Sequence, residues 1–161
     1  MYSALDIANY VLGYYCEKSV SGISNLKRQK ILYFLQAEFL VSKRKPLFKE
    51  DIEALDFGPV VHEVNKRFQI YGGAKIPYNL IDPKKNYKSR ISNRDKETIN
   101  NMLDVLDHYS STALLNIIHR QKPWHDSYFM NGHEKCVIRN GEMDWIKVIS
   151  NQQLYDFFSE D

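Results

Sequence analysis

The segment from Asn25 to Lys43, NLKRQKILYFLQAEFLVSK, is apolar around most of a helical circumference between Ile31 and Val41. A surface helix carries one apolar stripe, whereas a helix that is apolar on several sides must be covered by its neighbours. Ser24 precedes the segment, and its hydroxyl can accept a hydrogen bond from a free N–H group of the first turn. The pattern therefore predicts a central helix, around which the rest of the chain packs.

Short capping patterns mark where other helices begin. In such a pattern, a Ser side chain and a carboxylate or amide three residues later satisfy free backbone N–H groups. Apolar residues at helical spacing follow it at three places: Ser3–Asp6, Ser92–Asp95 and Ser150–Gln153. Ser110 or Ser111 is expected to cap a helix through Ile118, and Pro123–Trp124 is expected to begin one short turn.

A further helix is expected from Pro59 to Gly72–Gly73. Proline suits the first position of a helix because its missing N–H would have no partner there, and Gly58 can adopt the backbone angles of an abrupt turn. Asp56 is expected to favour the positive end of this helix, and Glu63 to lie in or near its first turn.

The β content is expected to be small. The segment Leu47–Phe57 fits extended chain with one short strand near Ile52. Val137–Ile138 and Trp145–Ile146 are β-prone and are separated by Asn140–Gly141, a typical turn pair, so they can form a ribbon.

The expected fold class is mainly α (α+β), with residues 1–161 forming a single compact helical bundle and a small β-ribbon or short strands. The hydrophobic share of 43% and charged share of 26% fit such a globular domain. Residues 74–91 contain two prolines and little periodicity, which predicts a long loop.

Composition also restricts the cellular setting. Cys16 and Cys136 have no CxxC spacing, the N-terminus has no signal-peptide pattern, and no window reaches the ~18 apolar residues of a membrane span. We expect a cytoplasmic protein without a membrane partner. The net charge of +2 makes nucleic acid an unlikely partner.

Two short motifs resemble motifs of enzymes, but the rest of the sequence does not support either enzyme class. Asp56–Gly58 reads Asp-Phe-Gly, as in protein kinases, but the chain has no Gly-rich loop, strand lysine or catalytic loop before it. His62–Glu63 begins like the zinc motif H-E-x-x-H, but Lys66 stands where the second histidine should be.

Imidazole and carboxylate groups also occur together near the C-terminal part of the chain, at His119, His125, Asp126 and His133. They could support acid–base chemistry or bind a metal. Their spacing matches no established ligand pattern, so a structural or surface role is the favoured interpretation. We expect a protein that is not an enzyme and has no cofactor or metal.

Three motifs carry a resemblance to a known family. Leu26–Gln36, LKRQKILYFLQ, resembles the L-K-x-Q-K-L-L-Y-F-x-Q helix of the Panacea domain, the SocA-like antitoxin family that includes phage-associated GepA-type proteins. Glu53–Val61, EALDFGPVV, resembles its E-A-W-x-Y-G-P-V signature, and His119 with Pro123–Trp124 resembles a weaker third motif. The sequence departs from the family pattern at three positions: Leu55, Phe57 and Asn65.

The resemblance implies a binding function. Family members neutralise toxins encoded beside them by direct protein contact in bacterial or prophage toxin–antitoxin systems. One branch acts as an adaptor that delivers its toxin to a protease. The expected partner is therefore a cognate toxin encoded by the adjacent gene, with a protease as a further partner.

Thirteen residues form the expected motif and structural set. Gln29, Tyr33 and Gln36 align on one helical face, where they form either a buried hydrogen-bonded seam, which we favour, or a groove. The full set is Leu26, Lys27, Gln29, Lys30, Tyr33, Gln36, Asp56, Phe57, Gly58, Pro59, Glu63, Pro123 and Trp124.

Aromatic and cationic residues of expected exposure are the predicted partner contacts. They are Tyr14, Tyr15, Lys43, Arg44, Lys45, Tyr78, Tyr87 and Arg90. Three other functions stay open: a nucleic-acid-binding regulator using Lys27, Arg28 and Lys30, a phage-encoded inhibitor of a host defence protein, and a hydrolase or metalloprotein using the histidine group.

Overall fold

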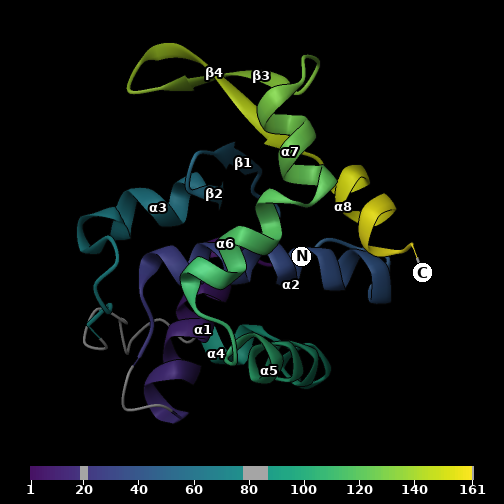
Figure 1. Cartoon of the computed structure of the whole chain (residues 1–161). Helices are drawn as coiled ribbons and strands as arrows, with labels where there is room; N and C mark the ends of the chain where they lie inside the picture. The colour runs from purple at the N-terminus through teal and green to yellow at the C-terminus, as the bar shows by residue number, and fades with distance from the viewer. Residues whose placement is uncertain (19–21, 78–86, 161) are drawn as a thin grey trace.

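The computed structural model describes residues 1–18, 22–77 and 87–160. Figure 1 shows a group of helices with a small sheet at one side, from which β3 and β4 project. The elements in order are α1 (Ala4–Lys18), α2 (Asn25–Lys43), β1 (Ile52–Leu55), β2 (Gly58–Val60), α3 (His62–Phe68), the 3₁₀ turn η1 (Gln69–Tyr71), α4 (Tyr87–Arg90), α5 (Asn93–Leu106), α6 (Ser111–His119), α7 (Lys122–Phe129), β3 (Glu134–Arg139), β4 (Glu142–Ile149) and α8 (Asn151–Phe158). The expected mainly helical class with a small β part is confirmed.

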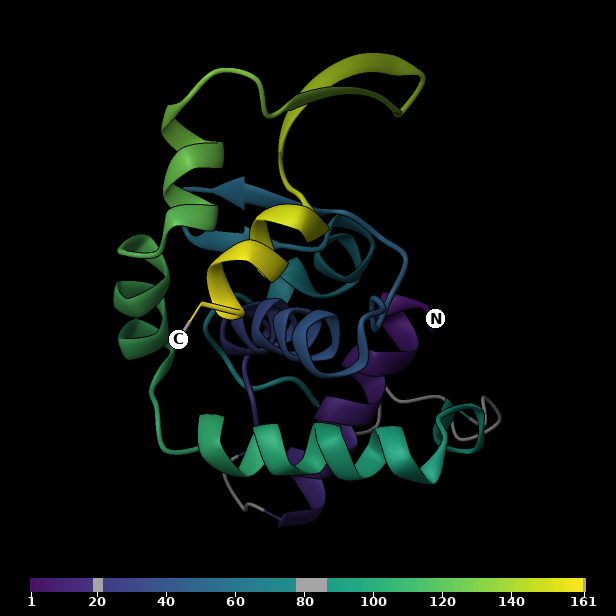
Figure 2. The same ribbon diagram turned by 90° about the vertical axis from the view of Figure 1, so that its right-hand side faces the viewer.

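Helix α2 is the centre of the domain, as its all-round apolar pattern predicts. Figure 2 looks nearly along its axis, and α1, α5, α6 and α8 surround it. Leu32, Tyr33 and Leu35 are fully buried. Burying side chains on several sides of one helix removes a large apolar area from water, which is the main source of stability in a small domain.

The capping serines lie where the sequence predicts them. Ser24 Oγ accepts the N–H of Lys27 at 3.1 Å. Ser150 and Gln153 form a complete reciprocal capping box. At Ser92 the box is only half formed, because the Asp95 carboxylate accepts hydrogen bonds from Tyr2 and Lys43 instead of returning one to the helix start.

The prediction that Pro59 begins a helix is wrong. Pro59 lies in β2 opposite Ala54 of β1, and α3 begins only at His62. Strand β2 is at the edge of the sheet, where a residue without an N–H is tolerated. Gly58, with φ of +102°, follows the two-residue turn of this hairpin, so Gly-Pro closes a hairpin rather than opening a helix.

Asp56 consequently does not lie at a helix start. It occupies the hairpin turn with Phe57, whereas Glu63 is in the first turn of α3 as expected. Helix α7 is also longer than the single turn that Pro123–Trp124 suggested. Part of the expected loop over residues 74–91 is helical, since α4 lies within it.

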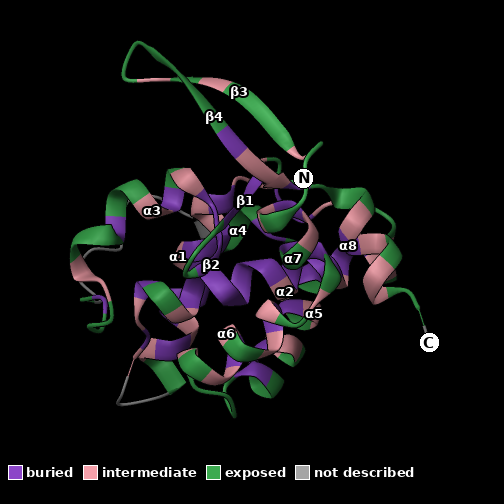
Figure 3. Cartoon of the chain, turned by 45° about the horizontal axis from the view of Figure 1, so that its top comes forward, coloured by how far each residue is buried: buried purple, intermediate pink, exposed green. Residues whose placement is uncertain are grey.

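The four strands form one antiparallel sheet in the order β2-β1-β4-β3. The predicted ribbon is present: six residue pairs join β3 to β4, and Asn140 and Gly141 make its turn with φ of +53° and +77°. Only the last residues of β4 pair with β1, at Ile52↔Ile149 and Glu53↔Val148. The rest of the ribbon extends beyond the domain, and its distal part is largely exposed (Figure 3).

In the parts of the chain that the structure describes, no helix combines the length and the apolar character needed to cross a bilayer.

Candidate partner-binding surface

The hairpin turn, Asp56–Phe57, is the place where the three sequence motifs meet. From the first motif, Gln29 Oε1 of α2 accepts the N–H of Val61 at 2.8 Å, directly after β2. This bond fixes the far strand of the hairpin to the central helix. Because both groups are buried, the bond also satisfies two polar atoms that would be costly to leave unpaired.

The third motif holds the turn from the opposite side. Trp124 Nε1 donates to the Leu55 carbonyl oxygen at 2.9 Å, and His119 Nε2 lies 3.2 Å from the Asp56 carbonyl oxygen. Tyr128 donates its hydroxyl hydrogen to the Asp56 carboxylate. The Tyr128 ring stacks on Trp124 with ring centres 4.7 Å apart. The hairpin backbone is thus hydrogen-bonded from α6 and α7 as well as from α2.

The Gln-Tyr-Gln stripe of α2 is a buried seam, as favoured from the sequence. Gln36 Oε1 accepts the N–H groups of Leu47 at 2.8 Å and Phe48 at 3.1 Å, and its Nε2 donates to the Phe48 carbonyl at 3.0 Å. Tyr33 donates its hydroxyl hydrogen to Gln121 Oε1 at 2.7 Å. The seam therefore attaches loops to the core and leaves no groove along this face for a partner.

An ion pair attaches the ribbon to the same hairpin. Arg139 of β3 makes two hydrogen bonds, at 3.0 and 2.6 Å, to the Glu53 carboxylate of β1. Glu53 is only 4% exposed, and this pairing raises the pKa of the Arg139 guanidinium. Lys147 of β4 donates to the Tyr128 carbonyl at 2.7 Å. The base of the ribbon is therefore held in one orientation relative to the hairpin.

Beside these anchors, large apolar side chains are exposed. Phe57 at the hairpin turn is 65% exposed and Trp145 of β4 is 67% exposed. Both line an aromatic groove of about 490 Å³, together with Leu55 and Tyr128. Contiguous exposed apolar side chains of this kind mark interaction sites more often than ordinary surface.

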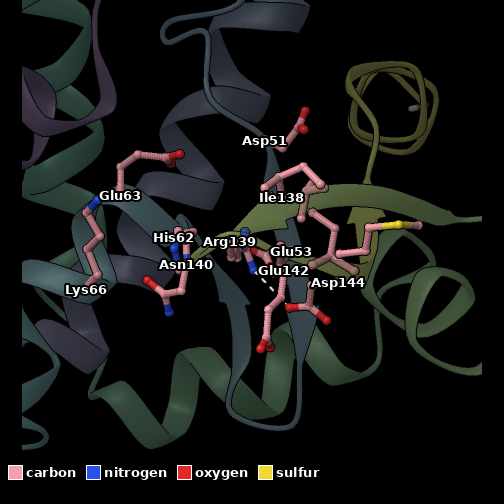
Figure 4. Close-up of a pocket in the computed structure, with 13 residues that line it drawn as sticks. Asp51, Glu53, His62, Glu63, Lys66, Ile138, Arg139, Asn140, Glu142 and Asp144 are labelled. Atoms are coloured by element: carbon pink, nitrogen blue, oxygen red, sulfur yellow. Dashed lines mark hydrogen bonds and ion pairs between the residues drawn. The ribbon is translucent and has the colours of Figure 1, made fainter.

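A second, charged groove of about 680 Å³ lies between the ribbon and α3. Figure 4 shows Glu63 and Lys66 reaching from α3, and Arg139 pointing at Glu53. The lining carboxylates outnumber the lining lysine and arginine side chains: they are Asp51, Glu53, Glu63, Glu142 and Asp144. Within the described residues, no group of three His, Cys, Asp or Glu side chains is arranged to hold a metal ion.

Six of the partner contacts expected from composition line neither groove: they are Tyr14, Tyr15, Lys43, Arg44, Lys45 and Arg90. Tyr15 is buried, and together with Tyr14 it lines a separate groove of about 330 Å³. Lys43 pairs with Asp95 at 2.5 Å and Arg90 with Asp6 at 3.2 Å. Tyr14 is half-buried and donates its hydroxyl hydrogen to an aspartate of α5. Arg44 and Lys45 are exposed and follow the C-terminal end of α2. Tyr87 begins α4, and Tyr78 lies outside the described residues.

Two of the three cations of the nucleic-acid hypothesis are inside the protein. Arg28 is fully buried against Phe68 and donates to the Ala8 carbonyl at 3.1 Å; burial lowers its pKa to about 9. Lys30 is buried too and donates to the Leu26 carbonyl, and burial lowers its pKa to about 8. Neither side chain can reach a phosphate from this position.

The members of the histidine group make separate contacts. The His119 ring packs on Trp124 with ring centres 4.1 Å apart. His125 Nδ1 lies 3.6 Å from the carboxylate of its neighbour Asp126, and its side chain is half exposed. The structural interpretation of His119 fits this arrangement, since its ring and Nε2 both contact the hairpin support.

Sequence reasoning missed the ribbon side chains and the Glu53–Arg139 pair. The sequence predicts that Trp145 lies in a ribbon and gives no prediction of a surface, although a Trp opposite Cys136 in the ribbon pairing is a usable signal. The ion pair joins residues 86 positions apart, and nothing in the local pattern connects them.

Comparison with known proteins finds a family match over the same motifs. The sequence model of the family described as "Antitoxin SocA-like, Panacea domain" matches residues 29–125, a range that holds most of the first motif and all of the second and third. The chain belongs to this family.

Antitoxin SocA of Caulobacter vibrioides (strain NA1000 / CB15N) is 48% identical to this Panacea-domain protein over 50 residues. The aligned part is 31% of this chain and 27% of that relative. No solved structure matches. The family match ends in α7, so the ribbon of β3 and β4 lies beyond the matched residues.

Proposed function

We propose that this protein is the antitoxin of a toxin–antitoxin pair and that it neutralises its toxin by direct contact through the hairpin turn and the ribbon. Membership of an antitoxin family supports the antitoxin role. The observation that carries the binding mode is the convergence of all three family motifs on one hairpin, whose turn residue Phe57 is left exposed beside Trp145.

The composition of the surface fits a protein interface. Trp, Tyr and Arg supply most hot-spot energy at interfaces, and large apolar anchors need rigid supports to bind without a high entropic cost. Trp145, Tyr128 and Arg139 line the aromatic groove, and the hydrogen bonds described above hold the two strands that flank it.

The departures from the family pattern also fall here. Leu55, Phe57 and Asn65 all line the aromatic groove. A shared scaffold that changes side chains in one groove can keep its fold while it changes its partner. These positions would therefore contribute to the choice of toxin.

The test is co-expression with the protein encoded by the adjacent gene. Wild-type protein is expected to restore growth and to co-purify with that protein. The Trp145→Ala variant should bind on the order of tenfold more weakly, since it removes a large aromatic anchor. Tyr109→Ala removes another exposed aromatic side chain, outside both grooves, and should bind like the wild type.

Failure of the wild-type protein both to restore growth and to co-purify would contradict the proposal. Equal weakening by Trp145→Ala and Tyr109→Ala would remove the assignment of the surface while leaving the antitoxin role. Whether the bound toxin is blocked or also delivered to a protease is decided by its half-life in cells: delivery shortens it in the presence of the antitoxin, and blocking does not.

A further inference from the structure

The outer edge of β3 is open to a further strand. Strand β3 is the last in the order β2-β1-β4-β3, and among the strands of the described residues it pairs only with β4. An edge of this kind presents a row of free backbone N–H and C=O groups, which natural proteins usually cover, shorten or occupy. This edge is part of the ribbon that extends beyond the domain (Figures 1 and 3).

The ribbon register shows which backbone groups are free. Arg139 and Glu142 flank a two-residue turn, so they form a hydrogen-bonded pair, and such pairs recur at every second residue of an antiparallel ladder. The bond from Val148 N–H to the His133 carbonyl, at 2.9 Å, follows the same alternation. We define the β3 edge as the outward backbone groups of Cys136 and Ile138, since the backbone N–H of Glu134 is already bonded to its own carboxylate.

An apolar row accompanies this edge. In the register, Ile138 lies opposite Met143 and Cys136 lies opposite Trp145, so these four side chains share one face of the ribbon. Ile138, Met143 and Trp145 are 67%, 69% and 67% exposed. A segment that paired with the β3 edge would place every second side chain beside this row.

The other face of the ribbon is charged, and its charge indicates which kind of segment could pair with the β3 edge. Lys135 pairs with Asp51 at 2.7 Å and Arg139 with Glu53 at 2.6 Å, so both cations of β3 are neutralised within the protein. Asp144 also lies 4.0 Å from Arg139, and the carboxylates of Glu63 and Glu142 remain in excess over Lys66 in the charged groove on that face. Basic side chains complement this face, whereas acidic ones are repelled.

We propose that the β3 edge is completed by an extended segment of the toxin, which adds a fifth strand to the sheet. Its apolar side chains lie on the Ile138–Trp145 face and its basic side chains on the side of the charged groove. Backbone pairing supplies affinity in this mode, and the alternating side chains supply specificity. The inference rests on the proposed function and names how its partner is held.

Proline substitution separates backbone pairing from side-chain contact. Cys136→Pro removes one outward N–H and places a ring at the edge, while the ladder to β4 keeps its bonds because the N–H of Cys136 points away from it. The affinity for the protein encoded by the adjacent gene should fall on the order of tenfold or more. Cys136→Ala keeps the N–H, and its affinity should stay within about twofold of the wild type.

A charge reversal tests the chemistry of the segment. Glu142→Lys should weaken binding on the order of tenfold and reduce the dependence of the affinity on salt. Glu97→Lys makes the same change at an exposed position of α5 and should leave the affinity unchanged. Amide hydrogen exchange adds a pattern that only strand addition produces: protection gained in the complex at Cys136 and Ile138, with little change at Val137 between them.

The outcomes separate the two proposals. If the wild-type protein does not bind the adjacent gene product, the proposed function fails and this inference fails with it. If the wild type binds and Cys136→Pro binds equally well, strand addition is wrong and the antitoxin role stands. Equal losses for Cys136→Pro and Cys136→Ala, with unchanged circular dichroism and thermal midpoints, would show side-chain contact and overturn the inference.

Discussion

At the scale of single residues, buried polar side chains of α2 organise this protein. Gln29 and Gln36 sit in the core, yet each has its amide oxygen bonded to backbone N–H groups of segments far along the chain. A buried glutamine of this kind holds loops in place rather than binding a ligand, because its hydrogen-bonding capacity is used within the fold.

Gln36→Leu is expected to lower the free energy of unfolding by about 3 kcal/mol. The substitution leaves the buried N–H groups of Leu47 and Phe48 without their acceptor, and an unpaired buried group costs about 1–3 kcal/mol. Urea denaturation measures the change. Gln152→Leu, the same replacement at an exposed position of α8, should change stability by less than about 0.5 kcal/mol; similar losses in both variants would contradict the seam.

Lys30 is expected to make stability rise with pH. Burial lowers its pKa to about 8 from the ordinary 10.5, so between these values the unfolded chain binds more protons than the folded protein. The free energy of unfolding then increases with pH in that window, by at most about 1.4 kcal/mol per pH unit. The penalty on the folded state is complete below pH 8.

The measurement is the difference in stability between wild type and Lys30→Met, followed by urea denaturation from pH 7 to pH 10. The wild type should gain on the variant as the pH rises. Lys45→Met removes an exposed lysine and should show no such trend. Parallel curves for wild type and Lys30→Met would show that burial does not shift this lysine.

At the scale of elements, the β1–β2 hairpin is a small unit held by its surroundings. Strand β2 has three residues, too few to be stable as a separate hairpin. Its position depends on Gln29 from α2, Trp124 from α7 and the Glu53–Arg139 pair at the ribbon. The position of the exposed turn therefore depends on two helices and the ribbon.

Gly58→Ala is expected to destabilise the protein by about 1–3 kcal/mol. Gly58 has φ of +102°, which a residue with a Cβ rarely adopts, and an added Cβ would lie 3.2 Å from Leu115 Cδ1. Gly73→Ala is the matched control, since its added Cβ would be 3.8 Å from the nearest atom and its φ is not in that region. Thermal unfolding should separate the two variants, and equal midpoints would contradict the strained turn.

At the scale of the whole molecule, the helical scaffold and the projecting ribbon differ in how far their side chains are buried. The buried hydrophobic core is built by α1, α2, α5, α6 and the base of the sheet, whereas the distal ribbon contributes exposed side chains. Stability and binding should therefore be separable by shortening the ribbon.

A shortened ribbon should fold and fail to bind. Residues 136–145 are replaced by Asn-Gly, which joins Lys135 directly to its partner Ile146 through the same kind of two-residue turn. Glu53→Gln accompanies the deletion, because Arg139 is lost and an unpaired buried carboxylate would be costly. Circular dichroism should show an intact helical domain, while the shortened protein should no longer restore growth when it is co-expressed with the product of the adjacent gene. Glu53→Gln alone is the control, and retained rescue by the shortened protein would contradict this division.

Local pattern predicted much of the helical fold. The central position of α2, the caps at Ser24 and Ser150, and the Asn-Gly ribbon turn depend on residues within a few positions of one another, so they are readable from sequence. The placement of Pro59 could not be predicted from the sequence, because a proline after glycine suits both a helix start and an edge strand. Pairing with β1 decided between them.

The amino-acid sequence by itself determined the central helix, the helix starts that a serine caps and the family, because periodicity, capping and motif spacing are short-range properties. Only the tertiary structure decided which side chains are exposed and available to a partner. Burial of Tyr15, Arg28 and Lys30, and exposure of Phe57 and Trp145, depend on packing between segments far apart in the chain. Similar residue types can be core or surface, and long-range contacts alone distinguish the two.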